Sequence, residues 1–345
     1  MVPNPHDETI NGIKVCAVPI PQGRLERMTL TTWYVLWRAL RLRGDCYHFH
    51  DPELIPAGII LKFFGRRVIY DVHEDVPASI RSRDYIPRPL RWTISACMTI
   101  LEKIIGLLFD AFCAATPSIA RRFPKHKTTT LQNFPLLGDT YRIAKSVTDS
   151  ATHHRIVYTG NIARERGAVE MVRAMARVNR EIPATLTLVG RFSPPALEQE
   201  IRQMSAFEHV DFLGWRSYAE ANEVMEGASV GLVLYHPAPN HTEAMPNKMF
   251  EYMGVGIPVI ASFFPLWKWI VEEARCGLVC DPCDPQAIGD AILWILKHRA
   301  EAHEMSLRGM EAARTKYNWS AEETKMLELY DRILHHPGPL PARST

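Results

Sequence analysis

The sequence predicts an α/β protein made of two Rossmann-like domains that face a cleft. Three observations lead to this prediction. The chain has 345 residues, which suits about two domains. Short β-rich runs alternate with amphipathic stretches, and several of the runs end in glycine, where open parallel sheets place their ligands. No period of 20–50 residues repeats, which argues against a solenoid or a propeller.

The second half of the chain carries the clearer pattern. Strands are expected at 155–159, 185–189, 210–213, 230–235, 258–262 and 278–280. Helical stretches fill the intervals, which predicts a parallel sheet covered by helices on both faces through right-handed crossovers. Gly160, Gly190 and Gly214 follow the first three strands, where a ligand would meet helix N-termini.

The first half is also α/β but less regular. Strands are expected at 13–18, 46–50, 68–72, 111–115 and 128–132, and helices at 27–43, 52–64 and 89–110. The polar stretch 138–154 lacks a sustained apolar period and is the predicted hinge.

The predicted domains follow from this hinge. They are an N-terminal acceptor-side domain at 1–140, a C-terminal nucleotide-sugar domain at 155–316, and a last helix at 317–335 that packs back on the first domain. The end, 335–345, holds three prolines and is expected to be a frayed tail.

Composition and charge exclude several classes of protein. The hydrophobic fraction of 47% is that of a globular chain, not of a disordered or collagen-like one. A net charge of +2 is too small for whole-chain binding to nucleic acid, so no nucleic-acid partner is expected. Seven cysteines, an odd number, and the lack of an apolar signal-peptide core after Met1 predict a cytoplasmic protein. The longest apolar run near the middle, 104–109, is too short for a transmembrane helix.

The segment 239–262 carries the most chemistry. It follows a strand, places Pro246 at the predicted first helical position, and ends its helix near Gly254–Gly256. The N–H groups and dipole of this helix start, with Lys248 in the first turn, predict an anion site that suits a diphosphate. Glu243 and Glu251 flank the helix start, and each carboxylate can accept two hydrogen bonds from ribose or hexose hydroxyls.

The segment resembles the Glu-x7-Glu signature of the retaining, GT-B-fold glycosyltransferases of family four (group 1), in the bacterial cell-surface polysaccharide branch. Residues 158–167 resemble the family's donor-diphosphate loop, although many relatives have arginine where this chain has Asn161. Residues 212–215 resemble its base-side loop. Further matches are 276–282 near the sheet edge and, in the first half, 48–54 and 68–75. The resemblance covers nearly the whole chain.

The resemblance implies an activity. A sugar would pass from a nucleotide-sugar donor to a saccharide or polyprenyl-linked acceptor, with retention and with no cofactor besides the donor substrate. No Asp-x-Asp pair exists in the chain to hold a divalent metal, so no metal is expected.

The resemblance also implies site residues. Arg166 and Lys248 would neutralise the diphosphate, and Glu251 would hold the donor ribose. Glu243 and His73, which ends a first-domain strand, would contact the transferred sugar as catalytic residues. The full donor-binding set is Gly160, Arg166, Gly190, Trp215, Asn247, Lys248 and Glu251, and His50 and Asp51 are weaker candidates in the first domain.

Two further patterns need separate interpretations. Cys276, Cys280 and Cys283 have the spacing of an iron–sulfur ligand set, but the chain does not predict the matching barrel, so small apolar side chains are expected there. The stretch 81–109 combines basic and apolar residues at helical spacing. It is interpreted either as a helix packed on the first sheet or as a peripheral contact with the inner face of the plasma membrane.

The start of the chain leaves alternatives open. Members of the family usually begin with a strand, a glycine-containing loop, a helix and a second strand before the equivalent of 11–15, so the usual first βα unit is expected to be missing. The alternative hypotheses are a truncated, non-catalytic relative that binds nucleotide-sugar, and a sugar-nucleotide epimerase on the same architecture. Fold alone does not choose between these classes.

Overall fold

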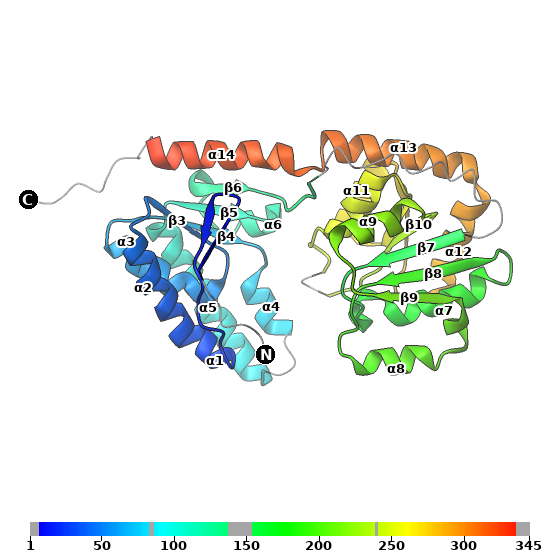
Figure 1. Ribbon diagram of the computed structural model, residues 1–345, viewed down its shortest axis with the longest axis horizontal. Helices are drawn as coiled ribbons and strands as arrows, with labels where there is room; N and C mark the ends of the chain where they lie inside the picture. The colour runs from blue at the N-terminus through cyan, green and yellow to red at the C-terminus, as the bar shows by residue number, and fades with distance from the viewer. Residues whose placement is uncertain (1–6, 83–85, 137–153, 239–240, 336–345) are drawn as a thin grey trace, which may run out of the picture. The chain divides into compact units, whose positions relative to one another are not determined.

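A computed structural model describes residues 7–82, 86–136, 154–238 and 241–335 of the chain (Figure 1). The chain divides into two compact units. Unit 1 comprises residues 1–132 and 324–345, and unit 2 comprises residues 133–323. Each unit has its own parallel sheet. The predicted hinge, 138–154, lies outside the described residues except for His154, and the domain boundaries given above stay a prediction.

Unit 2 contains a six-stranded parallel sheet in the order β12-β11-β10-β7-β8-β9. The strands are β7 (His154–Thr159), β8 (Ala184–Val189), β9 (Val210–Gly214), β10 (Val230–Val233), β11 (Val259–Ser262) and β12 (Gly277–Cys280). All six were predicted. β10 ends two residues earlier than expected, because the Tyr235 N–H donates to the Ser262 hydroxyl (2.8 Å) instead of continuing the ladder.

Helices cover both faces of this sheet, as predicted. Ile156 and Tyr158 of β7 lie in one apolar core with α7 and α12, whereas Val157 lies in a second core with α10 and α11. This division follows from the alternation of side chains along a strand. The helices are α7 (Ala168–Val178), α8 (Ala196–Arg202), α9 (Tyr218–Glu226), α10 (Asn247–Val255), α11 (Pro265–Ala274), α12 (Pro285–Lys297) and α13 (Arg299–Thr315).

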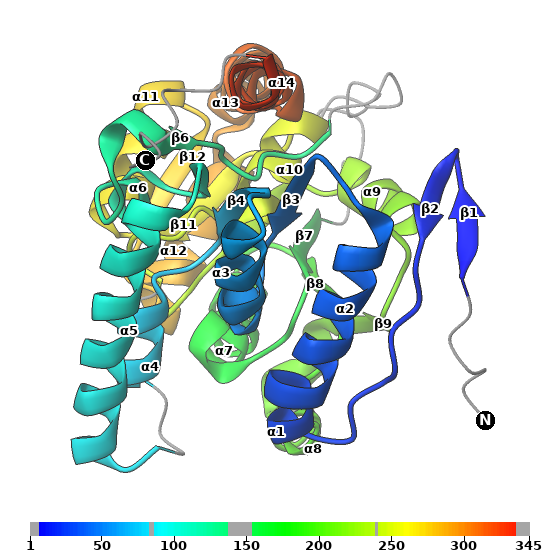
Figure 2. The ribbon, with the colours of Figure 1, turned by 90° about the vertical axis from the view of Figure 1, so that its left-hand side faces the viewer.

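Unit 1 contains a four-stranded parallel sheet in the order β3-β4-β5-β6. Its strands are β3 (Cys46–Phe49), β4 (Arg67–Val72), β5 (Ala111–Ala114) and β6 (Thr128–Thr130). The strand expected at 13–18 needs a correction. It is β2 (Ile13–Val15), which pairs antiparallel with β1 (Glu8–Ile10) apart from the parallel sheet (Figure 2). Asn11 and Gly12 both have positive φ between these strands, and the Asn-Gly pair favours such a tight hairpin.

The three helices predicted for unit 1 are present, with shifted boundaries. The first is divided into α1 (Arg24–Glu26), a π-helical turn at Arg27–Thr31 and α2 (Thr32–Leu42). The others are α3 (Ile55–Phe63), which follows a short 3-10 turn, and α5 (Arg88–Leu108). Sequence reasoning missed α4 (Val76–Ser82) and the short α6 (Pro117–Ala120). Within the described ranges, no helix combines the length and the apolar content that crossing a bilayer requires.

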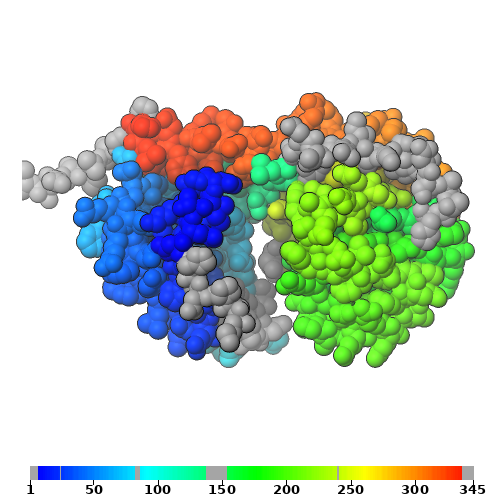
Figure 3. Space-filling model, viewed as in Figure 1, coloured from blue at the N-terminus to red at the C-terminus, as the bar shows by residue number. Residues whose placement is uncertain are grey.

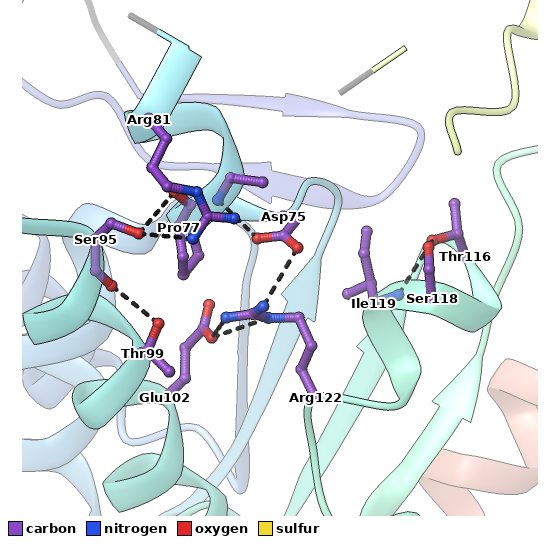
Figure 4. A network of polar contacts seen from close by, with 11 residues as sticks. Asp75, Pro77, Arg81, Ser95, Thr99, Glu102, Thr116, Ser118, Ile119 and Arg122 are labelled. Atoms are coloured by element: carbon purple, nitrogen blue, oxygen red, sulfur yellow. Dashed lines mark hydrogen bonds and ion pairs between the residues drawn. The ribbon is translucent and has the colours of Figure 1, made fainter. Parts of the chain in front are cut away.

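A polar network fixes α4, the helix that was missed (Figure 4). Asp75 accepts a hydrogen bond from the Ala78 N–H (2.9 Å) at the start of α4, and its other oxygen lies 3.3 Å from Arg122. Arg122 also donates to Glu102, which is buried on α5. Burial raises the pKa of Glu102, and Arg122 opposes that shift. A side chain 47 positions away in sequence therefore holds the start of α4, which local periodicity does not show.

The last helix, α14 (Trp319–His335), belongs to unit 1 from Thr324 onward, and its red surface runs along the upper edge of the blue and cyan elements in Figure 3. Leu329 and Ile333 pack against Ile69, Ala111 and Cys113 of the sheet and against Leu131, which follows β6. The Leu334 carbonyl accepts a hydrogen bond from Arg67 (2.8 Å) on β4. The helix thus closes one face of the sheet with both apolar and polar contacts.

We expect Leu329→Ala to lower the free energy of unfolding of unit 1 by about 2–5 kcal/mol, because it opens a cavity in this contact. Urea titration followed by hydrogen exchange of β4 and β5 peptides measures the change in unit 1 alone. The matched control is Leu327→Ala on the same helix, where the side chain is 60% exposed. Its effect should stay within about 0.5 kcal/mol, and equal effects of the two substitutions would contradict the packing described.

Candidate functional site

Three glycines join the carboxyl ends of β7, β8 and β9. The Gly160 N–H donates to the Val189 carbonyl (2.8 Å), and the Gly190 N–H donates to the Gly214 carbonyl (2.8 Å). A Cβ at Gly190, where φ is +148°, would lie 1.8 Å from the Gly160 carbonyl oxygen. Only glycine allows the two loops to approach so closely.

These strand ends line a pocket of about 380 Å³ in unit 2. Its lining brings together Gly160, Gly190 and Trp215, three of the predicted donor-binding residues. Sequence reasoning missed Arg191, whose guanidinium carbon lies 5.6 Å from the centre of the Trp215 ring. A basic residue directly after a strand-end glycine was the signal that could have found it. The full lining is Thr159, Gly160, Asn161, Val189, Gly190, Arg191, Trp215, Arg216 and Ala221.

A second pocket of about 420 Å³ contains two more of the predicted residues, Asn247 and Glu251. Asn133, Phe134, Pro135, Leu136, Tyr218 and Trp319 complete its lining. Glu251 is half-buried on α10. Burial raises the pKa of this carboxyl, and the nearby Lys248 opposes the shift.

The helix that carries Asn247, Lys248 and Glu251 begins one residue later than predicted. Pro246 is the residue before the first helical one, with an extended backbone, and the Met249 N–H donates to its carbonyl (3.0 Å). The fixed φ of proline suits this position as it would suit the first turn. Lys248 is therefore the second residue of α10, within the first turn as expected.

The Lys248 ammonium is buried without an acceptor. Its residue is 7% exposed, and Nζ has no hydrogen-bond partner among the described residues. Nζ lies 3.6 Å from the centre of the Tyr158 ring, and it would lie 3.4 Å from a Cβ at Gly160. Desolvation lowers the pKa of Lys248 well below its ordinary value, Arg166 lowers it further, and Glu251 opposes the shift. A buried donor left unpaired in this way marks a place where an anion would be stabilised.

Arg166 provides a second positive charge near the same rings. It ends a short 3-10 helix (Arg164–Arg166) and is half-buried. Its guanidinium carbon lies 5.1 Å from the centre of the Tyr235 ring, and the Lys248 Nζ lies 5.7 Å from that centre. The structure thus brings Arg166 and Lys248 close to the same aromatic side chain, Tyr235.

Tyr252 anchors this helix and was not predicted. Its hydroxyl oxygen accepts a hydrogen bond from the N–H of Thr159 at the end of β7 (3.0 Å). Its ring packs on Gly231, where a Cβ would lie only 2.4 Å from the ring atom Cδ2. Tyr252 follows Lys248 by four residues, so both side chains lie on one face of α10. That spacing was available in the sequence as a signal.

Glu243 is exposed in the turn that precedes α10. Neighbouring groups hold this turn, since the Trp267 Nε1–H donates to the Ala244 carbonyl (2.6 Å) and His241 Nδ1 lies 2.9 Å from the His236 carbonyl oxygen. Glu243 lines neither of the two pockets described above. The structure therefore does not bring it to the same pocket as Glu251.

His73 belongs to unit 1, directly after β4, and lies in a cluster of ionisable side chains. Its Nε2 atom is 3.3 Å from Asp71 Oδ2 and 2.9 Å from His50 Nδ1. Burial works to raise the pKa of Asp71, but the neighbouring His48 and His73 side chains outweigh it, so the pKa is lowered. The hydrogen bond with Asp71 raises the pKa of His73. Sequence reasoning did not single out Asp71 as the centre of this cluster.

Asp51, the weaker candidate, pairs instead with Arg27, at 3.3 Å between Oδ2 and Nη2.

The cysteines at 276, 280 and 283 do not form a ligand set. Cys276 and Cys280 are four residues apart on an extended backbone, a separation of about 13 Å at the usual rise of a strand. Burial raises the pKa of each of these thiols to about 12. Cys283 is exposed, as is Cys97 on α5 of unit 1.

The comparisons with known proteins bear on this site. Residues 153–298 match the family described as "Glycosyl transferases group 1". The phosphatidyl-myo-inositol mannosyltransferase of Mycobacterium leprae is 26% identical over 151 residues, which are 43% of this chain and 38% of that protein. The lipopolysaccharide core biosynthesis glycosyltransferase LpsD of Rhizobium meliloti is 26% identical over 178 residues, 51% of this chain and 49% of that protein. The matched region thus spans less than half the length of these curated relatives.

Solved structures are similar over most of the chain. Sucrose-phosphate synthase from Thermosynechococcus elongatus matches with a TM-score of 0.75 at 20% identity, over 96% of this chain and 86% of that one. Anabaena Alr3699/HepE in complex with UDP matches with a TM-score of 0.68 at 15% identity, over 90% and 84%. The fold is GT-B.

Together the comparisons support the prediction of a glycosyltransferase. They do not favour the non-catalytic binder or the epimerase.

We expect Lys248→Met to raise the free energy of unfolding of unit 2 by about 1–3 kcal/mol in the absence of nucleotide, because the variant removes an unpaired buried donor. Thermal unfolding of the nucleotide-free protein measures this. The matched control is Lys268→Met on α11. The Lys268 side chain is 40% exposed, and its replacement should change the free energy of unfolding by no more than about 0.5 kcal/mol. A Lys248→Met variant less stable than the natural chain would show that the ammonium has an acceptor after all.

Proposed function

We propose that the protein is a retaining, metal-independent glycosyltransferase that moves a sugar from a nucleoside diphosphate sugar to a saccharide or polyprenyl-linked acceptor. The observation that carries this proposal is the buried, unpaired Lys248 ammonium in the first turn of α10, beside Gly160. A diphosphate supplies the missing acceptor, and the free N–H groups of the helix start add further donors.

The proposed chemistry follows from where charge develops. Breaking the bond between sugar and diphosphate leaves negative charge on the diphosphate and positive charge at the anomeric carbon. Arg166 and Lys248 are fixed before the reaction by their contacts with Tyr235 and Tyr158, so they stabilise the leaving group without reorganisation. Two cations and a helix start perform the neutralisation that a divalent metal performs in other transferases.

The rest of the donor is assigned to the two pockets of unit 2. Glu251 accepts two hydrogen bonds from the ribose hydroxyls, and Asn247 beside it donates from its amide. Trp215, which is 61% exposed, offers its ring face to the base, and Gly160 and Gly190 let the backbone approach the phosphates. Arg191 adds a positive charge in the same pocket and compensates for Asn161, where many members of the resembled family have arginine.

The catalytic roles of Glu243 and His73 remain part of the proposal. Glu243 lies on the loop that leads into α10, where its carboxylate is free to turn toward the transferred sugar. His73 is proposed to contact that sugar from unit 1, with its ring oriented by Asp71.

The acceptor is proposed to lie at the cytoplasmic surface of a membrane. Along α5, Leu90, Trp92, Ile100 and Leu107 are exposed. Arg88 and Lys103 on the same helix are also exposed and carry positive charge. This combination suits an anionic lipid surface, from which a polyprenyl-linked saccharide would be taken.

We expect Arg166→Ala and Glu251→Ala each to weaken binding of the nucleotide-sugar by a factor of about 10–150, because each removes a charged hydrogen bond worth about 1.5–3 kcal/mol. Calorimetric titration with a panel of nucleoside diphosphate sugars measures this and identifies the base. The matched controls are Arg164→Ala and Glu272→Ala. The natural Arg164 side chain pairs with Glu200 on the surface, and Glu272 lies on α11. Unchanged affinity in both site variants, or equal losses in the controls, would refute the site.

We expect EDTA to leave the initial rate of transfer undiminished, since Arg166, Lys248 and the helix start carry the phosphate charge. The rate is followed as release of nucleoside diphosphate in buffer treated to remove metals. A rate that falls with EDTA and returns with Mg²⁺ or Mn²⁺ would contradict the proposed metal independence.

A further inference from the structure

The cluster around Asp71 in unit 1 contains more ligand atoms than the proposed sugar contact uses. His48, His50 and Asp71 each offer one ligand atom, and these atoms all lie within 4.8 Å of one another. Asp71 Oδ2 is 3.5 Å from His48 Nε2 and 3.0 Å from His50 Nδ1. In a tetrahedral site with metal–ligand bonds of about 2.0–2.1 Å, neighbouring ligand atoms are about 3.4 Å apart. Both separations from Asp71 Oδ2 are close to that value.

The sheet places these side chains on one face. β3 and β4 are adjacent parallel strands in which His48 pairs with Ile69, so the position two residues beyond His48 lies opposite Asp71. Side chains two apart along a strand point the same way. His48 and Asp71 therefore lie on one face of the sheet because of strand register, and His50, the first residue after β3, continues that alternation.

The His48 ring is held in the orientation that a ligand needs. Its Nδ1 atom lies 2.6 Å from the Tyr330 hydroxyl of α14. Its Nε2 atom, on the Asp71 side, is buried and has no hydrogen-bond partner within the described part of the chain. An imidazole whose far nitrogen is hydrogen-bonded is the usual arrangement of a metal-bound histidine, since the outer partner fixes both the tautomer and the ring.

We infer that His48 Nε2, His50 Nδ1 and Asp71 Oδ2 form a binding site for a divalent first-row transition ion in unit 1. Two imidazoles and one carboxylate suit Zn²⁺, Co²⁺, Ni²⁺ or Fe²⁺ and disfavour Mg²⁺ and Ca²⁺, which prefer oxygen ligands. Three protein ligands leave a position open for water. The ion would separate the Asp71 carboxylate from the two nitrogens, which crowd around one oxygen atom in its absence.

One consequence rests on the proposed function. His50 Nδ1 cannot bind an ion and keep its 2.9 Å contact with His73 Nε2 at the same time. Occupation of the site would therefore release His73 and place a positive charge beside the proposed sugar contact. We expect the ion to inhibit transfer, which is compatible with transfer that needs no metal.

Binding is tested on the full chain without a histidine tag, freed of metal by EDTA and dialysis. Titration with CoCl₂ should give visible absorption bands of a low-coordinate cobalt–imidazole site, saturating at one ion per chain and abolished by Zn²⁺ but not by Mg²⁺. Absence of saturable bands would overturn the inference.

Variants assign the ligands. His50→Ala should weaken cobalt binding by at least about 100-fold, and Tyr330→Phe by about 10-fold as an outer partner. The His50 side chain is 60% exposed, so its loss should leave thermal unfolding unchanged and separate loss of binding from loss of fold. The matched control is His126→Ala, an exposed histidine of the same unit, which should bind cobalt as the natural chain does. Equal cobalt affinity of the His50→Ala variant and the natural chain would overturn the assignment.

The nucleotide titration keeps the two proposals apart. A chain that binds cobalt but no nucleoside diphosphate sugar supports the metal site and refutes the proposed function. A chain that binds the sugar nucleotide but no cobalt supports the proposed function and refutes the metal site. If the chain binds both cobalt and the sugar nucleotide, Zn²⁺ should inhibit transfer by the natural chain but not the residual transfer by His50→Ala. Equal inhibition of the two chains would refute the inference that the ion acts by releasing His73.

Discussion

Burying an ammonium costs free energy unless an acceptor compensates for the lost water. Among the described residues, the Lys248 Nζ has no hydrogen-bond acceptor and lies against the face of the Tyr158 ring, with the Tyr235 ring farther away. Several features of the unit serve to keep this cation in place. Tyr252, on the same face of α10, accepts the Thr159 N–H and so attaches the helix to the end of β7. The absence of a side chain at Gly160 leaves the ammonium free to approach the strand end. The unpaired ammonium lowers the stability of the unit, and under the proposed function it is in position before the diphosphate binds.

The glycines at the carboxyl ends of β7, β8 and β9 also hold backbone donors in fixed positions. Gly160, Gly190 and Gly214 all have positive φ, and the loops they begin are joined by backbone hydrogen bonds. A rigid arrangement of backbone N–H groups results, and the pocket beside it contains both the exposed Trp215 ring and the charge of Arg191. Unit 1 is organised differently. There the polar groups at the strand ends gather around a single carboxylate, Asp71, and α14 reaches them through Tyr330.

Much of unit 2 could be predicted because its signals are local. Each strand is a short apolar run that ends in glycine or a turn, and Pro246 with Lys248 marks the helix start. What could not be predicted depends on distant partners. β10 ends where it does because of the Ser262 hydroxyl, 27 residues away, and α4 begins where Asp75 meets Arg122. The burial of Lys248 belongs to the same class, since it depends on rings from β7 and from the loop after β10. The β1–β2 hairpin is a different case, because the Asn11-Gly12 signal was present and was not used.

The distribution of the thiols has a practical consequence. Burial raises the pKa of Cys113, Cys276 and Cys280, and that of Cys46 to about 11, so these side chains react slowly with maleimides at neutral pH. Cys97 and Cys283 are exposed, the first on unit 1 and the second on unit 2. Labelling a chain with Cys16 replaced, with a mixture of two different maleimide dyes, would therefore attach one dye to each unit. Energy transfer between the two dyes would report how the separation of the units changes when the nucleotide-sugar and the acceptor substrate are added.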